Sequence, residues 1–120
     1  MPTLPPEIQQ VQGVTVISLG EDYANLYESL LENLSIVTQL AQTISPPRMV
    51  MDLRNVKFVG SAFLGFAVNL HKILTAREGG RFAICELSPF CRTALTVSRL
   101  ETVLDLFDDL ESATFAFKPK

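Results

Sequence analysis

Two short runs of the chain are almost wholly apolar: MVMDL at residues 49–53 and FAIC at residues 82–85. Such runs are typical of strands that are covered on both faces, as in a parallel sheet. Parallel strands need a long connection between them, usually a helix. The intervening sequence favours one over residues 61–77, and Gly79-Gly80 fit its C-terminal end. These features predict a strand–helix–strand unit.

The N-terminal third adds a hairpin and a helix to this unit. Residues 7–12 and 14–19 flank Gln12-Gly13, which predicts a β-hairpin whose second strand has one better-buried face. Residues 23–44 carry apolar side chains at three- and four-residue spacing, which predicts one long helix. We expect Asp22 to cap this helix and Pro46-Pro47 to end it.

The C-terminal third continues the alternation. Ser88-Pro89 predicts the start of a third helix that runs to Ser98, because serine caps helices and proline fits their first turn. Residues 103–107 read as a short extended piece. The tail after it predicts a last helical turn, with Phe115 and Phe117 packing back on the core.

The order of elements predicts an α/β fold with a small mixed β-sheet, an N-terminal hairpin and parallel later strands. The 120 residues fit a single domain, 1–120, and a chain of this length buries roughly two-thirds of its unfolded surface. Hydrophobic residues make up 48% and charged residues 19%, which indicates an ordinary globular protein.

Charge and composition argue against several functions. The net charge of −3 gives no electrostatic reason to bind nucleic acid. No run approaches the roughly 18 apolar residues of a membrane helix, and MPTLPPEIQQ does not resemble a signal peptide. We therefore expect a cytoplasmic protein without membrane insertion. Cys85 and Cys91 should be buried free thiols, and His71 alone cannot make a zinc site, so we expect no cofactor.

The sequence offers little for catalysis. A Ser–His–Asp arrangement would need His71, which lies inside the second predicted helix. The pair Asp108-Asp109 lies next to a helix start, where carboxylates stabilise the helix dipole. Phosphate-binding glycine motifs are absent from the sequence. We expect that the protein is not an enzyme.

One segment, NVKFVGSAFLGF at residues 55–66, is unusual. It delivers a strand into Gly60 and places Ser61 where the second helix must begin. Ser61 can cap that helix through its hydroxyl, or carry a phosphate, which helix N-termini stabilise. Phe63, in the first turn, is either a core anchor or an exposed contact.

The segment MDLRNVKFVGSAFLG resembles bacterial anti-sigma-factor antagonists, in which a strand ending Asp-Leu precedes a Phe-x-Asp-Ser-Ser/Ala-Gly-Leu-Gly motif. The stretch REGGRFAICELSPFCRTALTVSRLETVLDLFDDLESA is also similar to that family, so the resemblance covers about residues 48–114. It implies a STAS-like fold, with a small mixed sheet and helices packed mainly on one face. The family's acidic residue before the serine is Gly60 here, and Phe63 replaces a glycine.

The resemblance also implies a function. Such proteins bind an anti-sigma factor, often a serine kinase, and thereby free a sigma factor for transcription. The kinase phosphorylates a serine at the start of the second helix, which matches Ser61, and phosphorylation breaks the complex. The implied partner-binding residues are Glu21, Asp22, Gly60, Ser61, Ala62 and Phe63.

Two alternatives remain open on the sequence. A STAS-like domain can be a structural subunit that is not phosphorylated, for instance of a lipid-transport ATPase, or a small-molecule sensor. A structural subunit predicts a constant apolar interface that includes Phe63, and a sensor predicts an enclosed pocket with convergent polar groups. The sequence leaves the oligomeric state open.

Overall fold

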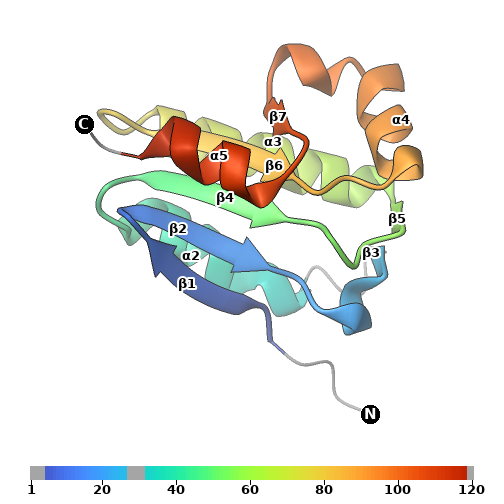
Figure 1. Ribbon diagram of the computed structural model, residues 1–120, viewed down its shortest axis with the longest axis horizontal. Helices are drawn as coiled ribbons and strands as arrows, with labels where there is room; N and C mark the ends of the chain where they lie inside the picture. The colour runs from blue at the N-terminus through green and yellow to red at the C-terminus, as the bar shows by residue number, and fades with distance from the viewer. Residues whose placement is uncertain (1–4, 27–31, 119–120) are drawn as a thin grey trace.

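The centre of the protein is a mixed five-stranded sheet in the order β1-β2-β4-β6-β7. The computed structural model describes residues 5–26 and 32–118 (Figure 1). β1 and β2 are antiparallel, and β2, β4, β6 and β7 run parallel to one another, which confirms the predicted mixed sheet. Its strands are β1 (Glu7–Val11), β2 (Val14–Ser18), β4 (Arg48–Asp52), β6 (Arg81–Cys85) and β7 (Asp105–Phe107).

The predicted hairpin is confirmed, and its turn explains why it forms. Gln12 and Gly13 have φ values of 52° and 83°, the left-handed pair that a two-residue type I′ turn requires. The turn closes on the pair Val11 and Val14. The expectation of one better-buried face on the second strand is wrong, because Val14 to Ile17 are all buried.

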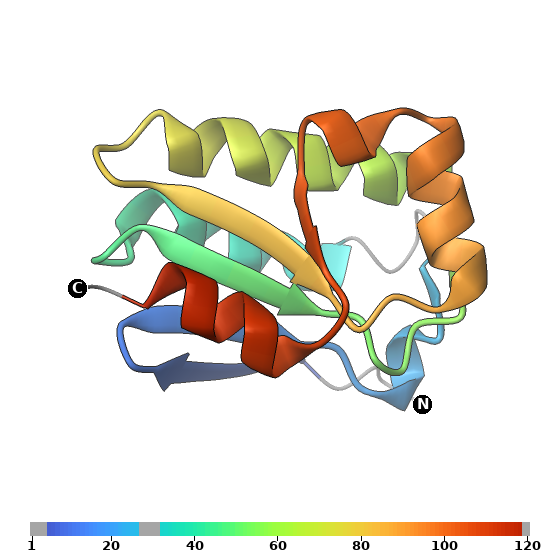
Figure 2. The same ribbon diagram turned by 45° about the horizontal axis from the view of Figure 1, so that its top comes forward.

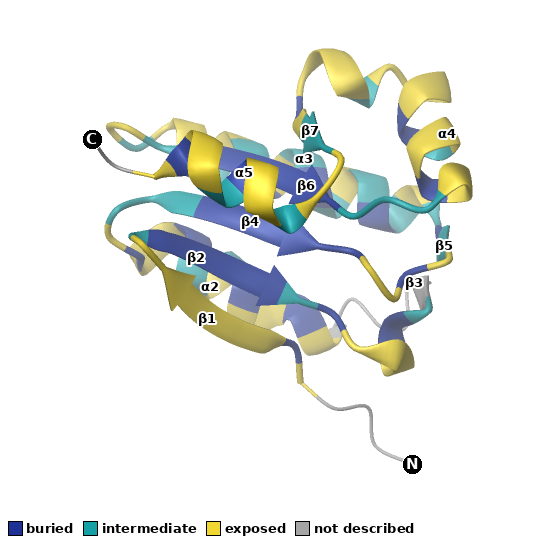
Figure 3. Cartoon of the chain, in the orientation of Figure 1, coloured by how far each residue is buried: buried dark blue, intermediate teal, exposed yellow. Residues whose placement is uncertain are grey.

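Helices on both faces of the sheet account for this burial. The helices are α2 (Ser35–Thr43), α3 (Ser61–Thr75), α4 (Pro89–Val97) and α5 (Leu110–Phe117). Figures 1 and 2 show α2 and α3 behind the sheet and α5 across its front. The larger core cluster joins α2 and α3 to the sheet, and a smaller one packs α5 against β2, β4 and β6. Figure 3 shows these central strands buried throughout most of their length.

The single long helix predicted over residues 23–44 is wrong in its first half. Residues Glu21–Tyr23 form a short 3₁₀ helix, followed by a two-residue strand, β3 (Asn25–Leu26), that pairs in parallel with β5 (Phe58–Val59). Asp22 therefore lies within a 3₁₀ turn and caps no long helix. Residues 27–31 lie outside the described residues, and a second 3₁₀ turn (Glu32–Leu34) leads into α2.

Long-range hydrogen bonds explain the difference. The backbone N–H groups of Lys57 and Phe58 both donate to the carbonyl of Ala24, at 2.7 and 3.0 Å. A helix through residue 24 would use that carbonyl locally, so pairing with β5 replaces helical continuation there. Local periodicity cannot reveal a partner that lies more than thirty residues away.

The elements of the C-terminal half agree more closely with the predictions from the sequence. Ser88 caps α4, since its Oγ accepts a hydrogen bond from the Cys91 N–H at 3.2 Å. Phe117 is fully buried, but Phe115 is 76% exposed, so the expectation that both pack back is wrong for Phe115. Residues two apart on a helix point about 200° apart, so only one of them faces the sheet.

The end of α3 also differs from expectation. Its C-cap is Ala76, and Gly79-Gly80 lie in the following turn. A Cβ on Gly80 would lie 1.7 Å from the carbonyl oxygen of Leu74. Gly80 is therefore required by a close backbone approach and not by a helix cap.

Candidate functional site

Ser61 is the first residue of α3 and is exposed to solvent. It follows Gly60, which is the N-cap residue in extended conformation, with φ −94° and ψ 173°. No side chain caps this helix, so the expectation that the Ser61 hydroxyl caps it is wrong. The physical reason is position: a cap must precede the first helical residue, and Ser61 already belongs to the helix.

The electrostatic environment at the N-terminal end of α3 favours an anion. The first turn contains no acidic residue, and Gly60 contributes no carboxylate. The Phe63 and Leu64 N–H groups donate to the Gly60 carbonyl at 3.1 and 3.3 Å. The N–H groups of Ser61 and Ala62 precede the first intrahelical bond and point out of the helix, where its dipole is positive. A phosphate on Ser61 would lie at this end of α3.

Phe63 belongs to the core. Its side chain is fully buried, and its ring centroid lies 6.2 Å from that of Phe66. Because Ser61 begins the helix facing outward, the residue two positions later turns toward the sheet. Phe63 therefore cannot contact a partner in this conformation, and its inclusion among the expected partner-binding residues is corrected. The core alternative left open by the sequence is the one observed.

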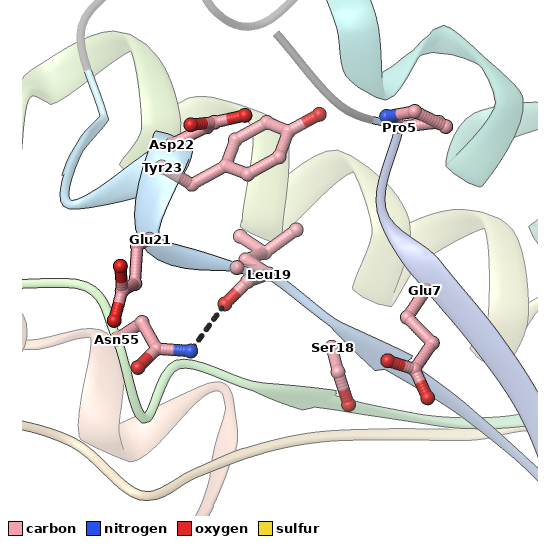
Figure 4. Close-up of a pocket in the computed structure, with 9 residues that line it drawn as sticks. Pro5, Glu7, Ser18, Leu19, Glu21, Asp22, Tyr23 and Asn55 are labelled. Atoms are coloured by element: carbon pink, nitrogen blue, oxygen red, sulfur yellow. Dashed lines mark hydrogen bonds between the residues drawn. The ribbon is translucent and has the colours of Figure 1, made fainter.

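The loop between β4 and β5 carries the chain to Ser61, and polar contacts define its shape. Asp52 is 6% exposed, and its Oδ1 accepts a hydrogen bond from the Arg54 N–H at 2.9 Å. Asn55 Nδ2 donates to the carbonyl of Leu19 at 3.2 Å, which joins this loop to the end of β2 (Figure 4). The Leu53 N–H donates to the Cys85 carbonyl at 3.1 Å. These contacts set where β5 and α3 begin.

Glu21 and Asp22 lie at the same end of the molecule as Ser61. Both are exposed residues of the 3₁₀ turn after β2, and the adjoining β3 pairs with β5 just before Gly60. A surface hollow of about 370 Å³ lies beside them (Figure 4). Its lining residues are Pro5, Glu7, Ser18, Leu19, Gly20, Glu21, Asp22, Tyr23 and Asn55. Burial, and then the Asp22 carboxylate, raises the pKa of Tyr23.

The sequence analysis did not identify an aromatic pair at the end of the molecule where Ser61 lies. The rings of Phe58 on β5 and Phe90 on α4 have centroids 5.2 Å apart with an interplanar angle of 30°. Phe90 is 51% exposed, and on the same helix Val97 is 77% exposed. The sequence signal for this pair was Phe90, an aromatic residue in the first turn of a capped helix. The contact between Phe90 and β5 is visible only in the fold.

The residues considered for catalysis lie in or next to helices. His71 lies within α3 and Asp109 caps α5 by accepting a hydrogen bond from the Ser112 N–H, at 2.7 Å. Cys85 and Cys91 are buried free thiols, as predicted. Burial raises the pKa of both, and the nearby Asp52 carboxylate raises that of Cys85 further, so both stay protonated.

Within residues 5–26 and 32–118, no three or more His, Cys, Asp or Glu side chains are grouped in a way that could hold a metal ion. None of the helices in those ranges has the length and apolar character needed to cross a membrane.

Comparison with known proteins agrees with this geometry. The STAS domain family model matches residues 5–113. An anti-sigma F factor antagonist of Paenibacillus polymyxa is 28% identical over 103 residues, which is 86% of each chain. The structure of an anti-sigma-factor antagonist (STAS) domain protein from Planctomyces limnophilus has a TM-score of 0.87 and 27% identity, covering 97% of this chain and 99% of that one.

A more distant structure shares the fold. The Bacillus cell fate determinant SpoIIAA, solved in its phosphorylated form, has a TM-score of 0.64 and 17% identity, covering 92% of this chain and 98% of that one. The STAS fold expected from the sequence is therefore confirmed. Since the family model spans nearly all of the described residues, this chain belongs to the STAS domain family.

Proposed function

We propose that this protein is an anti-sigma-factor antagonist, which acts by binding an anti-sigma factor and is controlled by phosphorylation of Ser61. The observation that carries the proposal is the exposed Ser61 at the uncapped start of α3. A curated relative with the same coverage of both chains is named an anti-sigma F factor antagonist, which supports the choice of partner. The anti-sigma factor would itself be the serine kinase that modifies Ser61.

The binding surface would comprise two parts. One is the polar part expected from the sequence, namely Glu21, Asp22, Gly60, Ser61 and Ala62. The other is the exposed edge of Phe90 against Phe58, which replaces the buried Phe63 as the apolar anchor. Aromatic anchors surrounded by polar residues contribute most of the affinity in many protein interfaces.

Phosphorylation would act on binding without harming the fold. A phosphate adds a charge of about −1.5 to −2, and the positive end of α3 stabilises it. Inside an interface the same charge must lose water, which is costly unless the partner offers a cation. The fold would therefore tolerate the modification while the complex would not.

The alternative functions make different structural predictions. A sensor needs an enclosed pocket, whereas the hollow beside Glu21 and Asp22 is lined largely by exposed residues. A constant apolar interface that includes Phe63 would characterise a structural subunit, and Phe63 is buried. The gene neighbourhood separates the remaining cases: a kinase-like anti-sigma gene favours the switch, and a transporter operon favours the subunit.

The direct test uses the purified anti-sigma factor of the same host. We expect it to bind the parent chain in calorimetry, and to add one phosphate to it in the presence of ATP, as measured by intact mass. Ser61→Ala should bind but gain no phosphate. Ser35→Ala is a matched control, because Ser35 is likewise the exposed first residue of a helix, α2. Absence of binding by the parent chain would refute the proposal, and phosphate on Ser61→Ala would refute the assignment of the site.

A further inference from the structure

β1 forms one edge of the sheet, and its outer side is open. The strand order puts it at the end of the sheet, and all five of its residues are exposed. Figure 3 shows the strand exposed along its whole length. Within the described ranges, no other strand pairs with its outer side. An open strand edge presents backbone N–H and C=O groups that can pair with another strand.

The hairpin register fixes which backbone groups face outward. Hydrogen-bonded and non-hydrogen-bonded pairs alternate along an antiparallel ladder, and a two-residue turn closes on a hydrogen-bonded pair, here Val11 and Val14. Glu7, Gln9 and Val11 therefore direct their backbone groups to β2. Ile8 and Gln10 direct theirs to the open edge.

This edge has few of the features that usually prevent strand pairing. Natural edge strands carry charged side chains, above all lysine, or proline or a bulge, or are very short. β1 contains neither lysine nor proline, and its pairing with β2 is unbroken from Glu7 to Val11. Ile8 is 41% exposed and Val11 is 36% exposed, so apolar surface flanks the open backbone.

We propose that β1 pairs antiparallel with β1 of a second copy of this chain, about a two-fold axis at Gln9, so that one sheet continues through both copies. In this register Ile8 lies opposite Gln10 of the second copy. All outward N–H and C=O groups of these two residues then find partners. Ser61 lies outside this surface, so the dimer goes beyond the function proposed above, although Glu7 of β1 also lines the hollow beside Glu21 and Asp22.

The sequence of β1 selects this register over its neighbours. A register centred on Ile8 would place Gln10 opposite Pro6, which has no N–H to donate. A register centred on Gln10 would place Ile8 opposite Gln12, whose φ of 52° belongs to the turn and not to a strand. Only the register centred on Gln9 uses strand residues that can both donate and accept.

Charge does not oppose a second copy as the occupant. Glu7 is the strand's one charged residue, and in this register it lies opposite Val11 of the second copy. The two Glu7 side chains are then about 14 Å apart along the strands, beyond the screening length of about 8 Å at physiological salt. An edge contact this small falls among weak interfaces, so the dimer should dissociate on dilution.

Sedimentation velocity tests the proposal on the full chain, from low micromolar to near-millimolar concentration. We expect a concentration-dependent dimer. Gln9→Lys and Gln9→Glu should each weaken it several-fold, because each places like charges opposite one another at the axis. An equimolar mixture of the two variants should restore association. Gln42→Lys, on an exposed position of α2, is the matched control and should dimerise like the parent.

Gln10→Pro provides a second test, because it removes an outward N–H that β2 does not use, and should abolish the dimer. A parent chain that stays monomeric at every concentration overturns the proposal. So does a dimer that Gln9→Lys leaves unchanged, or a mixture of the Gln9 variants that fails to associate. If circular dichroism shows that Gln10→Pro does not fold, the two Gln9 variants decide the matter, since they change only an exposed side chain and its hydrogen bond to Glu7.

Discussion

Replacing Ser61 with aspartate should raise the stability of the fold and lower its affinity for the anti-sigma factor. The two effects have different origins. Stability depends on the interaction of the new carboxylate with the start of α3, whereas affinity depends on its removal from water in the complex. A residue that merely begins a helix would show only the first effect.

The structure sets the size of each effect. The first turn of α3 contains no acidic residue and no side-chain cap, so an added carboxylate there should contribute about 0.3–1 kcal/mol to the free energy of unfolding. That corresponds to a rise in Tm of roughly 1–5 °C for a domain of this size. Ser61→Ala loses no capping bond and should change stability by less than about 0.5 kcal/mol.

The loss of affinity should be larger than the gain in stability. An unpaired polar group buried in an interface costs about 1–3 kcal/mol, and a charged one costs more. We therefore expect Ser61→Asp to weaken binding at least about tenfold. Ser61→Ala should bind like the parent chain.

The assay combines urea denaturation with calorimetric titration of the anti-sigma factor. Ser112→Asp is the control, because it adds the same charge to the first turn of α5, on the other face of the sheet. It should leave affinity unchanged. If Ser61→Asp binds as tightly as the parent, or if it loses affinity only because it has lost stability, the reasoning about this surface is refuted.

Three further predictions concern the fold and the apolar anchor. Phe63→Ala should lower the free energy of unfolding by about 3–5 kcal/mol in urea denaturation, because it opens a cavity in the core. Phe90→Ala should leave stability nearly unchanged and weaken partner binding. Equal losses of stability would contradict the assignment of Phe63 to the core and Phe90 to the surface. Gln12→Asn should raise the free energy of unfolding by about 0.5 kcal/mol, because asparagine tolerates the left-handed turn better, and an unchanged melting temperature would contradict it. Cys85→Ser should cost about 1–3 kcal/mol for an unpaired hydroxyl in the core.

The Cys85 prediction has a pH dependence with a definite sign. Burial, and then the Asp52 carboxylate, raises the pKa of the folded thiol above its unfolded value. The stability contributed by the protonated thiol is therefore fully present below the unfolded pKa and is lost as the pH rises above it. Urea denaturation across the alkaline range should show a shallower decline for Cys85→Ser than for the parent. Identical slopes would show that Cys85 titrates alike in both states.

Some properties of this protein follow from the sequence alone. The apolar runs that became β4 and β6, the turn at Gln12-Gly13 and the cap at Ser88 all act through residues close in the chain. Their conformations are therefore readable from local patterns. The motif around Ser61 also identified the fold. The sequence placed Ser61 at the first residue of the second predicted helix, which is where α3 begins.

Other properties depended on partners distant in the chain. Residues 23–26 have helical periodicity, yet β5 takes the carbonyl of Ala24 and turns the segment into a 3₁₀ turn and a strand. Phe63 and Phe90 are both aromatics in the first turn of a helix, but one faces the sheet and the other faces solvent beside Phe58. Spacing along the chain establishes that a helix has an apolar side, whereas the packing of strands and helices against it decides which residues that side buries.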